Sequence, residues 1–204
     1  MKTFKEYQQQ VIDEMSIAMK GDIPILHMSI QKLKGSYTFV AETTTDEGEK
    51  LKIYSYNGKK PHFKIGERVI KNGEEKFAVL MEIDLTSIPN MLGYTNIFNV
   101  DSVTVATIRQ GFGIARTIYL YFVKKLKYNL MGDEEQYFGS RKLWKKLSQH
   151  EDAIVDIIDI YNNRIIEKNV TLHHGSEDWD FDNRVWSYDT DKRHIRLILR
   201  DLKP

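Results

Sequence analysis

Two closely spaced glycines in Gln110-Gly111-Phe112-Gly113-Ile114-Ala115 could let backbone N–H groups close around an anion, because glycine has no Cβ. The preceding run, Val103–Ile108, is rich in β-branched residues and predicts a strand. Apolar residues then recur at the spacing of one helix face: Ile114, Ile118, Phe122 and Leu126. The first turn of a helix has N–H groups without intrahelical partners and a partial positive charge. The stretch therefore predicts a strand, a phosphate-sized loop and a helix start.

A second group that could do chemistry is a pair of carboxylates. Glu82 and Asp84 lie two residues apart in the strand-like run Phe77–Leu85, so their side chains point to the same face. A carboxylate there could bind a positively charged amine or, through a water molecule, remove its proton. Alternating charges are also typical of a solvated strand face, so both interpretations of Glu82 stay open.

Histidines and carboxylates gather again in His173–Asp180. The segment lacks the His-x-x-x-His and Glu-x-x-His spacings of helical metal sites, and Gly175 indicates a loop. We therefore predict no metal site. The later aromatic side chains could instead line an acceptor pocket or a protein interface: Trp179, Trp186 and Tyr188.

The first half of the chain predicts a helix followed by an antiparallel meander. Phe4–Met19 repeats apolar residues every three or four positions, as an amphipathic helix does. Asn57-Gly58 and Asn72-Gly73 are strong hairpin signals. The expected strands are Leu26–Leu33, Ser36–Ala41, Lys50–Tyr56 and Lys76–Leu85, with a further short strand or irregular link at Tyr94–Val100.

The second half predicts a strand–helix–strand unit and closing strands. Tyr128–Met131 is expected to run parallel to Val103–Ile108, because the helix between them forms a crossover. A helix over Gln136–Leu147 follows. The expected closing strands are Ala153–Tyr161, Arg164–Val170 and His194–Leu199. We expect one domain, 1–204, with a helix and meander over about 1–100, a central unit over about 101–150 and closing strands over about 151–204.

Composition excludes several classes of protein. The net charge of +1 does not indicate general nucleic-acid binding, and the absence of cysteine removes disulfides, thiolate nucleophiles and Cys-ligated metals. No apolar run approaches the roughly 18–20 residues that span a bilayer, and the start of the chain lacks the apolar core of a secretory signal. We expect a cytoplasmic protein without membrane contact. Phosphate-loop, dinucleotide and serine-elbow motifs do not occur in the sequence.

The order of residues around the two glycines resembles the acetyl-CoA signature Q/R-x-x-G-x-G/A of the GNAT N-acetyltransferases. Val105, Gln110, Gly113, Ile114 and Ala115 occupy the places of that signature. The resemblance implies a GNAT-like α/β fold, that is, a mixed, mainly antiparallel sheet with a splayed central parallel strand pair and flanking helices. It implies acetyl-CoA as co-substrate, with its pyrophosphate held by backbone amides of Phe112–Arg116. It also implies that the main chain of Val103–Val105 pairs with the pantetheine arm.

The same resemblance implies acetyl transfer to a primary amine, with a strand amide stabilising the oxyanion. Glu82, or a water that it positions, is then the proposed base. The segment Ser140–Leu147 resembles the later GNAT helix whose Tyr protonates the CoA thiolate, but Trp144 stands in the place of that Tyr. An indole is not a practical acid for a thiolate. Tyr137 is the nearest phenol in the sequence and is the candidate acid.

The acceptor stays open between a small-molecule amine and a protein. The alternative function is a GNAT-fold binding or structural protein without catalysis, which Trp144 and the aromatic C-terminal region favour. Divergent GNAT-like proteins occur in bacteriophage genomes, so the resemblance leaves open a virion protein or a protein that interacts with or modifies a host protein. The C-terminal strands could support a homodimer.

Overall fold

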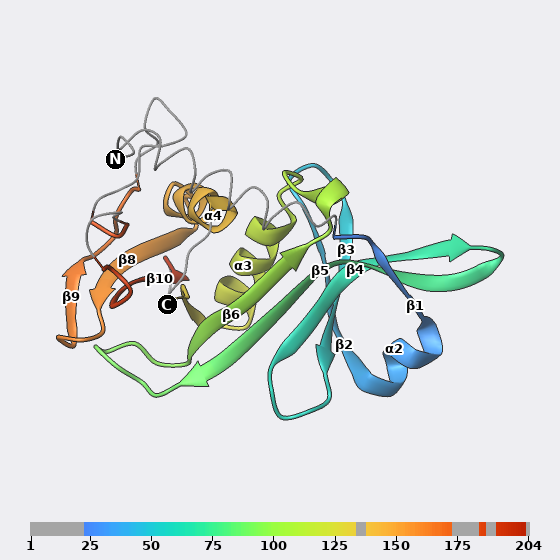
Figure 1. Cartoon of the computed structure of the whole chain (residues 1–204), viewed down its shortest axis with the longest axis horizontal. Coiled ribbons are helices and arrows are strands. Elements are labelled where there is room, and N and C mark those ends of the chain that lie inside the picture. Colours follow the sequence, from blue (N-terminus) through green and yellow to red (C-terminus); the bar gives the residue numbers. More distant parts are fainter. Residues whose placement is uncertain (1–22, 134–137, 173–183, 187–190, 203–204) are drawn as a thin grey trace, which may run out of the picture.

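The fold is mixed α and β, and a mostly antiparallel sheet dominates it (Figure 1). A computed structural model describes residues 23–133, 138–172, 184–186 and 191–202. Within these residues ten strands form one sheet in the order β2-β3-β4-β5-β6-β7-β10-β8-β9, with β1 paired to β5. The prediction of a mainly antiparallel sheet with flanking helices is confirmed. The predicted helix Phe4–Met19 lies outside the described residues.

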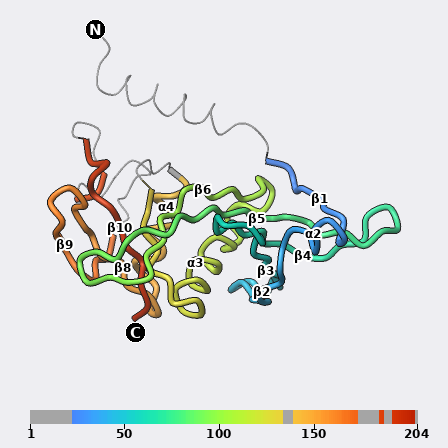
Figure 2. Tube along the Cα trace, turned by 90° about the horizontal axis from the view of Figure 1, so that it is seen from below, coloured from blue at the N-terminus to red at the C-terminus, as the bar shows by residue number. Residues whose placement is uncertain are grey.

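An antiparallel meander is present, as predicted, and its strands are β2 Tyr37–Thr44, β3 Lys50–Tyr56, β4 His62–Lys71, β5 Glu74–Ile88 and β6 Ile97–Val105. Strand β1, Leu26–Ser29, lies outside the meander and pairs with β5. Asn72 and Gly73 have φ of 55° and 76° and close the β4–β5 hairpin, as the sequence predicted. This hairpin extends beyond the rest of the sheet (Figure 2). Strand β4 was not predicted, because charged residues interrupt its alternation.

Three predicted segments before the two glycines are wrong in extent. The expected strand Leu26–Leu33 ends at Ser29, whose hydroxyl accepts a hydrogen bond from the backbone N–H of Lys32 and caps helix α2, Ile30–Ser36. The expected segments Tyr94–Val100 and Val103–Ile108 form the single strand β6. They precede residues Gln110–Gly113, which we call the signature loop. The last part of the expected strand Val103–Ile108 is instead a short 3₁₀ helix, Thr107–Arg109.

A parallel strand pair lies in the middle of the sheet. Helix α3, Ile114–Lys125, connects β6 to β7, Asn129–Met131, and the parallel ladder joins Ile97–Asn99 to β7. The pairing ends there: β6 continues beside β5, whereas the N–H of Gly132 bonds to Leu197 O at 2.9 Å. The remaining strands are β8 Ala153–Asp159, β9 Arg164–Glu167 and β10 Ile195–Asp201, and β10 lies antiparallel between β7 and β8.

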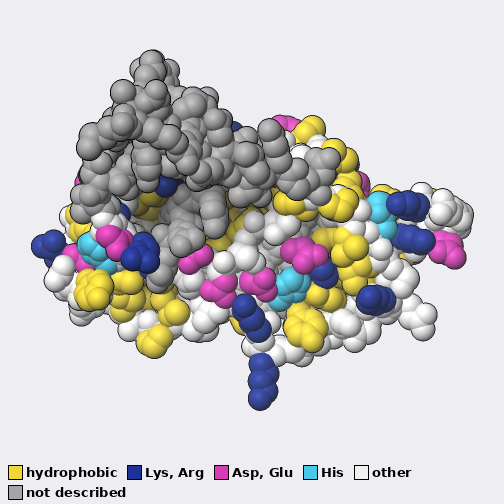
Figure 3. Space-filling model, viewed as in Figure 1, with side chains coloured by type: hydrophobic (Ala, Val, Ile, Leu, Met, Phe, Trp, Pro, Cys, Tyr) yellow, Lys and Arg dark blue, Asp and Glu magenta, His cyan; other side chains and the backbone are white. Residues whose placement is uncertain are grey.

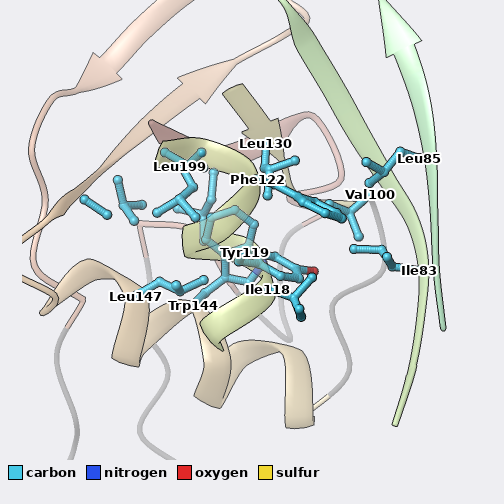
Figure 4. Packing of buried hydrophobic residues seen from close by; sticks show 14 of the residues in the cluster. Ile83, Leu85, Val100, Ile118, Tyr119, Phe122, Leu130, Trp144, Leu147 and Leu199 are labelled. Atoms are coloured by element: carbon cyan, nitrogen blue, oxygen red, sulfur yellow. The ribbon is translucent and has the colours of Figure 1, made fainter. Parts of the chain in front are cut away.

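Helices α3 and α4, Phe138–Ser148, pack on one face of the sheet. Figure 4 shows Ile118 and Phe122 of α3 pointing toward the side chains of β5 and β6. Trp144 of α4 is 1% exposed and contacts Tyr119 edge-on, with ring centroids 6.1 Å apart. Burial of this continuous apolar face is the main stabilisation of the two helices on the sheet.

The opposite face of the sheet is divided between an apolar part and a polar part. Helix α2 covers the apolar part, where Leu33 packs with Tyr54, Phe77 and Val79. Farther along β5 the same face carries Glu82 and Asp84, and Figure 3 shows acidic and histidine side chains gathered over β5 and β6. In the described part of the chain no helix is long and apolar enough to cross a membrane.

Candidate anion-binding loop and polar sheet face

The predicted strand, loop and helix start are present. Strand β6 ends at Val105, and the chain passes through the 3₁₀ turn to two glycines with positive φ, 92° at Gly111 and 73° at Gly113. L-residues with a Cβ rarely adopt these angles, which explains the glycines. Gly113 is the N-cap of α3 and offers no side chain to the helix terminus.

The N-terminus of α3 has open hydrogen-bond donors. Among the described residues, none accepts a hydrogen bond from the backbone N–H of Ile114, Ala115 or Arg116, and the first turn has no acidic residue. A Cβ placed on Gly111 would meet no atom within 4 Å. The loop therefore presents convergent donors next to open space, at the positive end of the helix dipole. This arrangement can hold a phosphate or a diphosphate.

The side chains of the loop divide into core and surface. Ile114 is 1% exposed and anchors the helix start in the core, with Ala115 packed against it. Phe112 is 42% exposed, and the Arg109 guanidinium lies 5.9 Å from its ring centroid. Gln110 turns back, and its Nε2 donates to Val105 O at 3.3 Å.

The main chain of Val103 and Val105 faces away from β5. The N–H of Ala106 donates to Leu80 O at 2.9 Å. Every second residue of an antiparallel strand bonds to the same neighbour, so Thr104 and Ser102 also turn their N–H and C=O groups toward β5. Val103 and Val105 are therefore the residues whose N–H and C=O groups point to the other edge. Strand β7 pairs with β6 at Ile97–Asn99, so at the two valines this edge has no strand partner among the described residues. An extended chain can bond to it there.

A β-bulge lies between the paired and unpaired parts of β6. Asp84 pairs with Ser102 and Leu85 with Val100, which leaves Asp101 as the extra residue. A bulge bends the strand and changes the direction of its backbone groups. Asp101 is held by Thr86 Oγ1 at 2.6 Å and by Asn99 Nδ2 at 2.9 Å. The bend therefore coincides with the place where β6 leaves β7.

Two ion pairs connect the signature loop to the turn between β2 and β3. Arg116 pairs with Asp46, and Arg109 Nη1 lies 3.0 Å from Glu49 Oε1. Arg109 Nη2 also lies 3.1 Å from Glu67 Oε1. The Nε of Arg116 is buried and has no hydrogen-bond partner among the described residues. The positive charges of Arg109 and Arg116, beside the candidate anion site, are thus partly balanced by carboxylates of the β2–β3 turn.

Glu82 and Asp84 share the polar face, as predicted, but neither is isolated. Lys64 Nζ donates to Glu82 Oε1, and His62 Nε2 lies 3.8 Å from Glu82 Oε2. Lys64 lies over the ring of Tyr37, 5.6 Å from its centroid. Burial, followed by the charge of Glu82, raises the pKa of the Tyr37 phenol. The proposed base is therefore a carboxylate that already holds an ammonium group.

A histidine–aspartate pair was missed by the sequence analysis. His62 Nδ1 lies 2.9 Å from Asp84 Oδ1, and Ser102 Oγ donates to Asp84 Oδ2 at 2.7 Å. Burial alone would raise the pKa of Asp84, but these hydrogen bonds from Ser102 and His62 hold it below its ordinary value. The only signal in the sequence is the single His at the start of β4, a strand that was not predicted.

The structure assigns no general acid among the residues considered for that role. Tyr137 lies outside the described residues, as do His173–Asp180. Trp144 is in the core, and burial raises the pKa of its neighbour Tyr119 far above the ordinary value of a phenol. Within the described chain no three His, Cys, Asp or Glu side chains gather in a way that could hold a metal ion.

No family model, curated protein or solved structure matches this chain.

Proposed function

We propose that the protein is an N-acetyltransferase of the GNAT type, which moves an acetyl group from acetyl-CoA to a primary amine. The observation that carries the proposal is the combination of two features at the end of β6. The α3 N-terminus offers N–H groups without partners among the described residues, and the neighbouring strand edge offers the main chain of Val103 and Val105. The first suits a diphosphate, and the second suits an amide-containing arm.

The residues around this edge would divide the binding work. Backbone N–H groups from Phe112 to Arg116 would hold the diphosphate of the CoA moiety, with the open space at Gly111 admitting it. The main chain of Val103–Val105 would pair with the pantetheine arm, which requires Gln110 Nε2 to leave Val105 O. Acetyl-CoA would supply the activated acetyl group at the point where β6 bends.

The transfer itself would form a C–N bond and break the C–S bond of the thioester. A backbone N–H near the bulge at Asp101 would stabilise the charge that develops on the carbonyl oxygen. Glu82, directly or through water, would accept the proton of the attacking amine. Its pairing with Lys64 is an example of an ammonium group held by this carboxylate. Tyr137 stays the candidate acid for the departing thiolate.

One observation favours a second candidate function, binding of CoA or a related anion without turnover. Trp144 has the place of the Tyr that the resemblance assigns as acid, it is 1% exposed, and its N–H is a donor that cannot usefully protonate a thiolate. A chain of this kind would keep the loop and the strand edge but release no acetyl group.

Calorimetric titration of acetyl-CoA into wild type, Gly113→Trp and Gly93→Trp tests the proposed site. Gly113 and Gly93 both have positive φ, 73° and 83°, and neither would place a Cβ within 3.4 Å of another atom. Backbone strain is therefore common to the two variants, whereas only Gly113 lies in the loop. We expect binding by wild type and Gly93→Trp and none by Gly113→Trp. Absence of binding by wild type would refute the cofactor assignment.

Thiol release separates the two candidate functions. Wild type that binds acetyl-CoA is incubated with a polyamine, a lysine peptide and a peptide with a free N-terminus, and free CoA thiol is measured. Release that depends on one of these amines supports the transferase. Tight binding with no amine-dependent release supports the binding protein.

A further inference from the structure

The turn between β2 and β3, residues Thr45–Glu49, is bound to both sides of the signature loop. On one side Glu49 pairs with Arg109, just before the glycines, and on the other side Asp46 pairs with Arg116, in the first turn of α3. The partners are far apart in the chain, since Asp46 and Arg116 are separated by 70 positions. One short acidic turn thus brackets the candidate diphosphate site, and we call it the acidic turn.

The acidic turn has its own internal hydrogen bonds. Thr45 is 4% exposed, its N–H donates to Glu49 O at 2.9 Å, and its Oγ1 accepts from the N–H of Glu49 at 3.1 Å. The N–H of Gly48 donates to Thr45 O at 2.9 Å, and Gly48 has a φ of 84°. These bonds hold the shape of the turn, so Asp46 is presented at the loop by a preformed element.

The two acidic partners differ in how easily they could be exchanged. The side chain of Glu49 is 17% exposed, and its Oε2 is buried without a partner among the described residues, so this pair is part of the packed structure. The side chain of Asp46 is 64% exposed, and its pair with Arg116 is a surface pair of low strength. A dianionic diphosphate can compete with one exposed carboxylate for the same guanidinium.

We infer that Asp46 is an internal competitor for the diphosphate of the cofactor: it occupies Arg116 in the free protein and must release it when the cofactor binds. This inference rests on the proposed function. The Arg116 atom that Asp46 holds is Nη2, which lies 3.7 Å from the Cβ position of Gly113, and the buried Nε of the same guanidinium has no hydrogen-bond partner among the described residues. Exchange of Asp46 for a phosphate oxygen would place the Nη2 end of the guanidinium on the ligand, beside the backbone N–H groups at the start of α3.

The acidic turn offers a matched control for a charge change. Glu47 is the neighbour of Asp46, is exposed, and forms no ion pair with any described residue. Asp46→Asn and Glu47→Gln remove the same charge from the same turn, but only the first frees Arg116. Loss of general electrostatic repulsion would affect both variants equally, whereas loss of a competitor affects one.

The test is calorimetric titration of CoA, and separately of inorganic pyrophosphate, into wild type, Asp46→Asn, Glu47→Gln, Arg116→Gln and the Asp46→Asn/Arg116→Gln double variant. We expect Asp46→Asn to bind CoA about three- to tenfold more tightly than wild type, and Glu47→Gln to change affinity less than about twofold. In the Arg116→Gln background the Asp46→Asn change should have no further effect. The affinities of the variants for pyrophosphate should follow the same order, because pyrophosphate contains only the diphosphate group that competes with Asp46 for Arg116.

Three results would overturn the inference. Equal affinity of wild type and Asp46→Asn would remove Asp46 as a competitor while leaving the cofactor site intact. An equal gain in CoA affinity in Asp46→Asn and Glu47→Gln would show that general electrostatic repulsion, and not a specific exchange at Arg116, limits binding. Absence of binding by both wild type and Asp46→Asn, to CoA and to pyrophosphate, would refute the proposed function itself. Circular dichroism of each variant, expected to match wild type, identifies any variant that has lost the fold.

Discussion

His62 Nδ1 lies 2.9 Å from Asp84 Oδ1, and this contact crosses from β4 to β5 on the face that α3 leaves uncovered. Ser102 of β6 donates to the second oxygen of Asp84 at 2.7 Å. One carboxylate thereby joins polar side chains of three neighbouring strands. Asp84 also lies directly before the register shift that places the bulge in β6. The stability of this part of the sheet should depend on the charge of Asp84.

Replacement of Asp84 by Asn should destabilise the protein more at pH 7 than at pH 3. The pKa of Asp84 is lower in the fold than its ordinary value of about 3.9, so its charged form stabilises the fold above that value. This contribution disappears as the pH falls through the lower pKa of the folded state. Urea unfolding of wild type and Asp84→Asn at the two pH values measures the difference. Glu47→Gln, a control outside the network, should show no such change, and a cost of Asp84→Asn that is equal at both pH values would contradict the prediction.

Lys64 and Glu82 should behave as a coupled pair. The side chain of Lys64 is 9% exposed, so Glu82→Gln leaves an almost buried ammonium without its carboxylate. We expect this variant to lose about 1–3 kcal/mol of unfolding free energy. Lys64→Met combined with Glu82→Leu should cost less than the sum of the single changes, because both charges leave together. A urea double-mutant cycle measures the coupling, and additive costs would show that the two side chains do not interact.

Gly66→Ala should disrupt the β4–β5 pair. A Cβ at Gly66 would lie 1.9 Å from the carbonyl oxygen of Ala78, which belongs to the backbone and cannot rotate away. We expect a loss of about 1–3 kcal/mol or more from the forced shift of the strands. Gly35→Ala is the control, since nothing lies within 4 Å of that Cβ in helix α2, and it should stabilise by about 0.4–1 kcal/mol. Thermal unfolding compares them, and similar melting temperatures would be inconsistent with the close approach at Gly66.

Trp144→Ala should be among the most destabilising changes in α4. Its indole is 1% exposed and packs edge-on against Tyr119, so truncation leaves a large cavity between the two helices. The expected cost is about 3–5 kcal/mol. Leu143→Ala, at a partly buried neighbour, should cost clearly less. Urea unfolding at pH 7 decides the order, and a cost of Trp144→Ala below that of Leu143→Ala would argue against a core position.

Much of the local structure could be predicted from the sequence because its signals are local. The four-residue repeat from Ile114 gave the helix that buries Ile118 and Phe122, and Asn72-Gly73 gave a hairpin with positive φ at both residues. The two glycines of the signature loop indicated the turn that ends at the N-terminus of α3. Each of these features is determined by the period of side chains or by the angles that a few adjacent residues can adopt.

The contacts that define the candidate site were decided by the tertiary structure. Asp46 meets Arg116 from 70 positions away, and His62 meets Asp84 from 22 positions away. Such pairs depend on strand register and on the position of the bulge at Asp101, which no local pattern specifies. The sequence by itself determined a strand, a glycine loop and a helix with an open N-terminus. Only the folded sheet decided which charges face that loop, because register and chain crossing bring distant residues together.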